Sequence, residues 1–511
     1  MASIIILAFF GVFVIFPVCS LFMRITPSGI VDVINLPQFY EALKNSLICS
    51  GTAALISLCL ALVCAMCIER TRIKHKAFFN LLFVMPMLIP SISHAFGLVA
   101  LFGANGLITK IFGLNGSIYG FTGIIAGSVM YSFPVAYIML ADILRYEDGT
   151  QHKAAEVLGV PSHRRFLDLT LPFLKRPLIS AFFAAFTMII TDYGVPLMIG
   201  GKTITLPVLM YNRAIGMIDY NSGSVIGALL LLPAVAAFVI DLLNSENRNN
   251  NFMPEPVTTK EGKFARTCSL IFCVVISIAI FAPVIAFCMM TFAKKYPVDA
   301  SFTLYHVLKT IRRGAGNYLL NSIIYAFFAG IAGTSLAFVC SYITARLERY
   351  KFSRIIHLIS LLTMAVPGIV LGLSFVIFFN RTSLYGTILI IIIANTVHFF
   401  ASPYLMMYNA LRKINPSLED TGSVLGVKRL NIIADVIMPE VMPAVKEMFA
   451  YFFVNSMMTV SAVSFLAPPS PRPVALMIPQ FEAQLLMESA AFISLVILVV
   501  NSLLKLFLRE K

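Results

Sequence analysis

The feature that most constrains this chain is a series of apolar stretches, each long enough to cross a lipid bilayer. Ser46–Ile68 and Leu270–Met290 are two examples, and both are continuous rather than alternating. A helix of about 20 apolar residues spans the hydrocarbon core, whereas a membrane barrel shows alternating segments of about ten residues. Because lipid offers the backbone no hydrogen bonds, continuous apolar segments indicate helices. We therefore predict an all-α polytopic membrane protein.

The apolar stretches predict about twelve transmembrane helices in the 511 residues. Charged residues make up 12% of the chain, well below the roughly 25% of soluble domains, which agrees with a surface that mostly contacts lipid. The N-terminal stretch Ile4–Phe22 is too long for a signal peptide and lacks the basic residues before it, so we expect it to be retained. The predicted spans are 2–22, 46–68, 78–102, 118–142, 178–199, 223–243, 268–292, 322–344, 356–379, 385–411, 444–466 and 484–508.

The basic residues predict the orientation of these helices. If the N-terminus lies in the cytoplasm, 26 of the 38 Lys and Arg residues fall in cytoplasmic segments. Cytoplasmic loops of membrane proteins carry such an excess. The pattern accounts for much of the net charge of +14 without a nucleic-acid partner, and it predicts a multi-pass protein with both termini in the cytoplasm.

The chain also contains an internal repeat. Lys153–Pro172 aligns without a gap with Asp420–Pro439, and both copies contain Val-Leu-Gly-Val. Upstream, Asn45-Ser46 and Asn321-Ser322 begin matching spans. Each half has an even number of predicted helices, so the two halves share one orientation in the membrane. The predicted parts are a first repeat at 1–244, a cytoplasmic linker at 245–266 and a second repeat at 267–511.

The repeated segment lies between the fourth and fifth predicted spans of each half, on the cytoplasmic side. Ala154, Ala155 and Leu158 fall on one face of a short helix, which Gly159 ends. We expect a second short helix over 162–169, ended by Leu171-Pro172 where the chain returns to the membrane. The second copy has its equivalents at Thr421, Gly422, Leu425, Gly426, Leu430–Val436, Met438 and Pro439.

This segment resembles the coupling loop of the permeases of bacterial binding-protein-dependent ABC importers. The family's pattern is Glu-Ala-Ala, three residues, Gly, nine residues, Ile-x-Leu-Pro. In that family the segment forms a coupling helix that docks into a groove on a cytoplasmic ATPase. The two-in-one arrangement is similar to the fused permeases of the ferric iron, 2-aminoethylphosphonate and thiamine importers. The resemblance covers essentially the whole chain and implies the plasma (inner) membrane of a bacterium.

The resemblance implies coupling roles for residues in both copies, with three departures from the family's pattern. Lys153 stands where the family has an acidic residue, Thr421-Gly422 replaces the two alanines, and Met438 replaces a leucine. The residues assigned to coupling are Ala154, Ala155, Leu158, Gly159, Leu171 and Pro172 in segment 153–172, and Asp420, Leu425, Gly426 and Pro439 in segment 420–439.

The same resemblance implies the partners, namely two copies of a cytoplasmic ABC ATPase, an extracytoplasmic solute-binding protein and membrane lipid. The run Gly200-Gly201-Lys202-Thr203 is similar to the end of a phosphate-binding loop, but Pro196 occupies the position of its first glycine. We therefore expect no catalytic residue, no metal site and no cofactor in this chain. The partner ATPase would bind ATP and Mg²⁺.

Polar residues near the end of the fifth span of each half are candidates for the substrate pathway. Polar groups inside spans are costly and often mark a pathway, and in the family the fifth helix lines it. The alternative is that these side chains cap or pack helices. At the repeat offset, Asp192 corresponds to Thr459 and is expected to face hydroxyls of the other half. The candidates are Asp192, Tyr193, Asn455, Thr459, Ser461 and Ser464.

We predict a permease that moves a small solute from an extracellular binding protein into the cytoplasm by ATPase-driven alternating access. Short runs around Asp192 and Thr459 resemble those of ferric iron and 2-aminoethylphosphonate importers. An ion-gradient-driven secondary transporter is the alternative, because parallel six-helix repeats occur there too. Such carriers usually need acidic or histidine relays in the membrane, for which the chain offers Asp192, His94 and His398. A membrane enzyme would need a cluster of catalytic residues, and the sequence has none.

Overall fold

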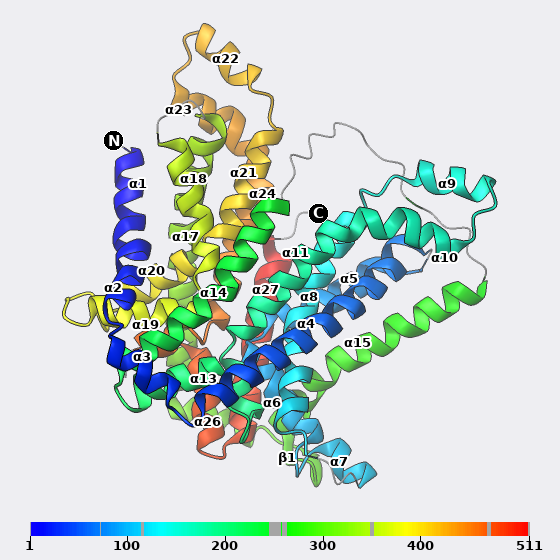
Figure 1. Ribbon diagram of the computed structural model, residues 1–511. Helices are drawn as coiled ribbons and strands as arrows, with labels where there is room; N and C mark the ends of the chain where they lie inside the picture. Colours follow the sequence, from blue (N-terminus) through cyan, green and yellow to red (C-terminus); the bar gives the residue numbers. More distant parts are fainter. Residues whose placement is uncertain are drawn as a thin grey trace. The chain divides into compact units, whose positions relative to one another are not determined.

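A computed structural model describes residues 2–71, 73–113, 117–244, 257, 263–347, 352–467 and 472–508. These residues are almost entirely helical (Figure 1), which confirms the predicted all-α polytopic class. The described residues include nine helices long and apolar enough to cross a membrane, or up to eleven if each of two bent helix pairs counts as one span. A small antiparallel hairpin of β1 (Ala293–Lys295) and β2 (Asp299–Phe302) is the exception.

The chain divides into two compact units, and the first helix of each sequence half belongs to the unit formed mainly by the other half. The N-half unit comprises Leu36–Leu209 and Val235–His306, and the C-half unit comprises Met1–Asn35, Met210–Ala234 and Val307–Lys511. In the C-half unit the rings of Phe10 and Phe400 lie 5.0 Å apart, and in the N-half unit Phe96 stacks on Phe287 at 5.6 Å. The compact units therefore differ from the sequence repeats at 1–244 and 267–511. The predicted linker, 245–266, lies outside the described residues except for 257 and 263–266.

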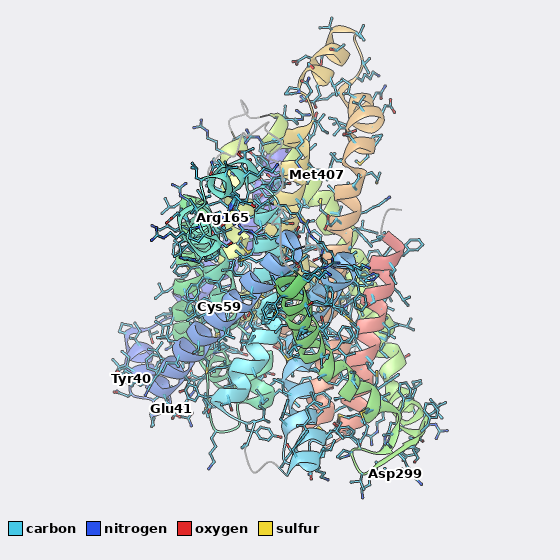
Figure 2. The ribbon with its side chains drawn as sticks, turned by 90° about the vertical axis from the view of Figure 1, so that its right-hand side faces the viewer. Tyr40, Glu41, Cys59, Arg165, Asp299 and Met407 are labelled. Carbon is cyan, nitrogen blue, oxygen red and sulfur yellow. The ribbon has the colours of Figure 1, made fainter. Side chains whose placement is uncertain are left out.

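In the N-half unit the helices α4, α8 and α11 pack against one another, and α15 packs on α6. Arg165 and Asp299 lie at opposite ends of this unit (Figure 2), so α10 and the β-hairpin occupy different ends. Its elements, apart from the hairpin, are α4 (Phe39–Arg70), α5 (Lys76–Val84), η2 (Met85–Leu88), α6 (Ser91–Phe102), α7 (Leu107–Phe112), α8 (Phe121–Leu144), α9 (Gly149–Val157), α10 (Ser162–Arg165), η3 (Phe166–Thr170), α11 (Leu171–Ile190), α12 (Gly194–Ile199), the start of α13 (Leu206–Tyr211), the end of α14 (Tyr220–Asn244), α15 (Lys263–Phe292) and the start of α16 (Tyr305–Thr310).

In the C-half unit α17 packs against α20, α21 and α24, and the N-terminal helix α2 packs on α19. Its elements, besides its parts of α13, α14 and α16, are α1 (Ala2–Phe10), η1 (Gly11–Ile15), α2 (Phe16–Met23), α3 (Pro27–Ile34), η4 (Asn212–Gly216), η5 (Ile311–Ala315), α17 (Gly316–Arg346), α18 (Ser353–Leu362), η6 (Thr363–Ala365), α19 (Gly368–Phe379), α20 (Ile388–His398), α21 (Ala401–Lys413), α22 (Ser417–Val424), α23 (Arg429–Ile432), η7 (Ile433–Ile437), α24 (Met438–Met458), α25 (Val463–Leu466), η8 (Val474–Leu476), α26 (Met477–Ala483) and α27 (Met487–Leu508).

Three of the predicted spans are interrupted rather than continuous. The helix predicted over 78–102 stops before Pro90 and restarts as α6. The one predicted over 356–379 bends by 106° beside Pro367, and the one predicted over 385–411 bends by 54°. A proline has no N–H to donate and its ring clashes with the preceding turn, which explains the first two breaks.

The fifth predicted span of each half also ends earlier than expected. The helix α11 ends at Ile190 rather than 199, and α24 ends at Met458 rather than 466. Each is followed by a short break and a short helix, α12 or α25. In addition, α24 contains Glu440, Lys446 and Glu447 and is not among the nine continuous spans.

The serines of the two Asn-Ser pairs accept hydrogen bonds from the backbone that follows these breaks. The backbone N–H of Leu206, the first residue of α13, donates to the Ser46 hydroxyl at 2.8 Å. In the C-half unit the N–H of Val474, the first residue of η8, donates to the Ser322 hydroxyl at 2.6 Å. The first N–H groups of a helix have no partner within it, so each serine satisfies a buried donor.

We predict that Ser322→Ala destabilises the protein by about 1–3 kcal/mol, because it leaves the buried Val474 N–H without an acceptor. The control is Ser374→Ala, since the Ser374 hydroxyl donates only to the Val370 carbonyl of its own helix. Thermal melting in detergent measures both variants. Equal melting shifts would contradict the role of Ser322.

Candidate functional site

The two repeated segments fold alike, each within its own unit. In the N-half unit α9 is followed by α10, η3 and α11, and in the C-half unit α22 is followed by α23, η7 and α24. The pairs α10/α23 and η3/η7 begin and end at the same positions of the sequence alignment. Figure 1 shows that α22 projects beyond the ends of α21 and α24. The sequence repeat is therefore also a structural repeat.

Both short helices end in the same glycine-dependent turn. Gly159 has φ 74°, and its N–H donates to Glu156 O at 3.0 Å, while Val160 N–H donates to Ala155 O at 2.9 Å. Gly426 has φ 75°, and Val427 N–H donates to Gly422 O at 2.9 Å. This hydrogen-bond pattern is the Schellman motif, which needs a left-handed residue after the helix. The Val-Leu-Gly-Val sequence thus encodes the turn.

The turn exposes an apolar pair at the tip of each segment. Val157 and Leu158 are 88% and 80% exposed, and Val424 and Leu425 are 87% and 74% exposed. A Cβ atom added at either glycine would meet no atom within 4 Å, so the tips are open. Of the other residues assigned to coupling, Ala154, Leu171, Pro172, Asp420 and Pro439 are exposed and Ala155 is partly buried.

The prediction that Leu171-Pro172 ends the second short helix is wrong. The helix continues from α10 through η3 into α11, and Pro172 lies in the first turn of α11. The turn before the proline is a π-helix, and Pro439 follows the equivalent π-helix η7. A wider turn accommodates a residue that cannot donate an N–H. Each segment therefore connects directly to its fifth membrane helix.

The start of α9 is fixed by Asp148, which the sequence had not indicated. Its carboxylate accepts the Thr150 hydroxyl at 2.5 Å and the Thr150 N–H at 3.0 Å. These two bonds lower the pKa of Asp148. A lowered folded-state pKa means that the cap contributes at neutral pH and is lost only as the pH falls through that value.

A buried charge network anchors the first segment to α4. Arg70, the last residue of α4, forms an ion pair with Glu147, and both side chains are buried. Arg70 also donates to the Thr170 hydroxyl at 2.6 Å, and Thr170 donates to Glu147 at 2.9 Å. His152 of α9 lies 2.9 Å from the same carboxylate. The network therefore connects α4, α9 and the start of the fifth helix.

The C-half unit has a corresponding anchor built from a different acidic position. Arg346, the last residue of α17, lies 3.7 Å from Glu419 of α22. The Tyr342 hydroxyl donates to Glu419 at 2.8 Å and accepts from Arg429 at 2.9 Å. Arg70 and Arg346 match at the offset of the Asn-Ser pairs, whereas Glu147 precedes its helix and Glu419 lies inside its own.

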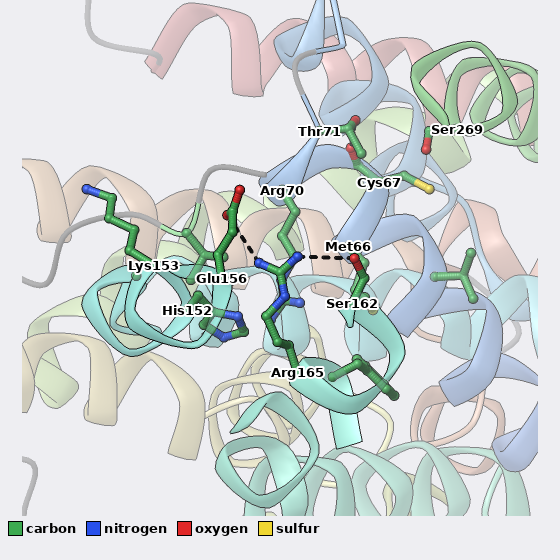
Figure 3. Close-up of a pocket in the computed structure, with 14 residues that line it drawn as sticks. Met66, Cys67, Arg70, Thr71, His152, Lys153, Glu156, Ser162, Arg165 and Ser269 are labelled. Atoms are coloured by element: carbon green, nitrogen blue, oxygen red, sulfur yellow. Dashed lines mark hydrogen bonds and ion pairs between the residues drawn. The ribbon is translucent and has the colours of Figure 1, made fainter. Parts of the chain in front are cut away.

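A pocket of about 370 Å³ opens beside the first anchor. Figure 3 shows Arg165 reaching Glu156 and Ser162, at 3.2 and 3.1 Å. Arg70, His152 and Lys153 also line the pocket. Residues of α4, α9, α10 and α15 line it.

The structure places the candidate pathway residues at the breaks after α11 and α24. Asp192 is 8% exposed and accepts the N–H groups of Val195 at 2.8 Å and Gly194 at 3.3 Å, and Tyr193 is also buried. Asp192 therefore caps α12 within the N-half unit. A pathway role for it stays a prediction.

The pathway candidates of the C-half unit are mostly partly buried. Asn455 donates to Tyr451 O at 2.8 Å and Ser464 donates to Ser461 O at 3.0 Å. Thr459 is buried at the end of α24. These bonds stay within their own helical segments, so the hydroxyls and the amide retain acceptor capacity toward other groups.

Comparison with known proteins identifies relatives of the whole chain. The family of binding-protein-dependent transport system inner membrane components matches residues 53–245 and 337–509. The chain is 26% identical to a ferric transport system permease protein of Actinobacillus pleuropneumoniae, over 92% of this chain and 72% of that protein. It is 24% identical to a putative ferric transport system permease protein of Haemophilus influenzae, over 92% and 78%. It is 22% identical to the thiamine transport system permease protein of Escherichia coli, over 65% and 62%.

We predict that Glu147→Ala destabilises the protein by about 3–5 kcal/mol, because it leaves the Arg70 charge buried without its carboxylate. The matched control is Glu156→Ala, which removes a carboxylate that is 43% exposed and paired with Arg165. An exposed pair contributes only about 0–1 kcal/mol. Melting in detergent distinguishes the two, and similar losses would contradict the anchor.

Proposed function

Because this chain belongs to the family of binding-protein-dependent transport system inner membrane components, we propose that it is a fused importer permease whose two coupling segments each dock onto one copy of a cytoplasmic ABC ATPase. It is a multi-pass transport subunit of the inner membrane and not an enzyme.

The observation that carries the docking proposal is the exposed apolar pair at each tip. Val157-Leu158 and Val424-Leu425 lie exposed at the ends of the short helices α9 and α22. Large side chains that are almost fully exposed gain free energy when a partner's pocket covers them. Since the two tips have the same sequence and the same turn, they fit the same pocket on two copies of one partner.

The anchors suggest how movement of the ATPases reaches the membrane. Arg70–Glu147 and Arg346–Glu419 fasten each segment to the second helix of its repeat, and α10 and α23 run through π-helices into the fifth helix. A displaced tip would therefore move two membrane helices together. Closure of two ATPases would act on both segments and shift the permease between inward and outward access.

The remaining partners follow from the same assignment. An extracytoplasmic solute-binding protein would deliver the substrate, the partner ATPase would bind ATP and Mg²⁺, and lipid would surround the spans. No cofactor in this chain and no nucleic acid are needed. The excess of Lys and Arg in one set of loops, 26 of 38, supports cytoplasmic N- and C-termini.

We assign the substrate to ferric iron. The support comes from two relatives named as ferric transport permeases, each aligned over 92% of this chain. The 2-aminoethylphosphonate class is the second candidate, supported by the short runs around Asp192 and Thr459. In either case the pathway candidates at the ends of α11 and α24 would offer oxygen and nitrogen groups to a polar solute.

We predict that Gly159→Val with Gly426→Val abolishes ATPase association and uptake while the protein still inserts. A β-branched side chain is strongly disfavoured at φ 74–75°, so both tips would change shape. The control is the double Asn variant, because Asn tolerates this conformation. Co-purification with the ATPase measures association, and normal association of the Val variant would refute the docking.

We expect cells that express the chain with its ATPase and binding protein to take up radioactive ferric iron, and the Gly159→Val, Gly426→Val variant to lose this uptake. The choice of substrate is then tested by competition with unlabelled 2-aminoethylphosphonate, which should not reduce uptake of ferric iron. Uptake that persists without an ATPase and collapses with a protonophore at constant ATP would instead indicate an ion-driven carrier.

A further inference from the structure

A very small cavity lies beside Asp192 inside the N-half unit. Its volume is about 10 Å³, which is room for one water-sized particle. Five oxygen-bearing side chains line it, from α4, α8 and the segment that follows α11. They are Ser46, Ser50, Ser128, Asp192 and Thr205. All five are at least nine-tenths buried.

Asp192 is surrounded by hydrogen-bond donors. Its carboxylate accepts from the N–H groups of Val195 and Gly194 and from the Ser91 side chain. Donors directed at a carboxylate stabilise the charge. Among the described residues no Lys, Arg or His forms an ion pair with it. A carboxylate buried without a basic partner is unfavourable when ionised, unless a cation lies beside it.

A second, independent observation is the hydroxyl of Thr205. It is 3% exposed and has no hydrogen-bond partner within the described structure. Buried polar groups nearly always have a partner, so an unpartnered hydroxyl at a cavity indicates a missing ligand. The Ser46 hydroxyl, which accepts the Leu206 N–H, lines the same cavity.

We propose that this cavity binds a single sodium ion, held by the Asp192 carboxylate and by hydroxyl oxygens that include Thr205. An oxygen-only set suits a hard cation. One carboxylate neutralises one positive charge, which favours a monovalent ion over Ca²⁺ or Mg²⁺. The small volume favours Na⁺ over the larger K⁺. The bound ion would fasten α4 and α8 to the segment 191–207.

The equivalent place in the C-half unit keeps Ser322 in place of Ser46 but has no carboxylate at the position of Asp192. At the repeat offsets Thr459 replaces Asp192 and Ala326 replaces Ser50. Tyr325, which is 2% exposed, stands in place of a cysteine that lines the cavity in the N-half unit. A place without a carboxylate needs no counter-ion, so the proposed site is single.

The test compares melting of the purified chain in sodium chloride, potassium chloride and choline chloride at equal ionic strength, together with ²²Na⁺ binding. We expect a saturable, sodium-specific rise in melting temperature and about one bound ion per chain. Thr205→Val and Asp192→Asn should weaken this response at least about tenfold, since each removes an oxygen ligand or its charge. Thr334→Val is the matched control, because its buried hydroxyl also lacks a partner but lies outside the cavity.

Equal melting in sodium and choline, with no ²²Na⁺ bound, would overturn the proposal and leave the cavity to water. An equal response to sodium and potassium would overturn the assignment of Na⁺. An unchanged response of Thr205→Val to sodium would also overturn the proposed site. If Asp192→Asn does not fold, Thr205→Val alone decides, because this substitution removes no charge and keeps the shape of the side chain.

Discussion

Inside a lipid bilayer each backbone N–H and C=O group must find its hydrogen-bond partner within the protein. Where a helix of this chain is interrupted, polar side chains supply such partners. Continuous helices satisfy themselves, but the fifth helix of each half stops inside the apolar region. Asp192 accepts the first two N–H groups of α12, and further along the chain Ser46 and Ser322 accept the first N–H of α13 and of η8. The breaks are therefore stable features of the fold.

The same requirement separates structural polar residues from those that can act on a partner or a solute. A carboxylate with three donors, as at Asp192, holds the chain in place and has one remaining direction for a ligand. The residues at the tips of α9 and α22 differ, since their side chains contact almost nothing in the chain. The docking proposed for these tips would cover this exposed apolar surface.

Each half anchors its repeated segment with an arginine and a glutamate, but the glutamate comes from a different place in each half. In each half the repeated segment is bound to an arginine at the end of a long helix, α4 or α17. Its glutamate lies before α9 in the first half (Glu147) and within α22 in the second (Glu419). A duplicated sequence can keep an interaction while its partner moves along the chain, because only the position of the carboxylate in space matters. The acidic residue of the family's pattern, replaced by Lys153 in the first half, is therefore dispensable for the internal anchor.

The sequence by itself determined the helical class, the two repeats and the position and turn of both repeated segments, because apolar length, the offset of the repeats and the glycine of Val-Leu-Gly-Val act locally. It did not predict the breaks at Pro90 and Pro367, the continuation past Pro172, or the anchors. Proline chemistry explains the two breaks locally, whereas the anchors and the grouping of helices depend on tertiary structure: Glu147 reaches Arg70 across 77 residues, and the first helix of each half packs in the unit of the other half. Contacts between distant segments leave no periodic pattern in the sequence, so only the folded chain decides them.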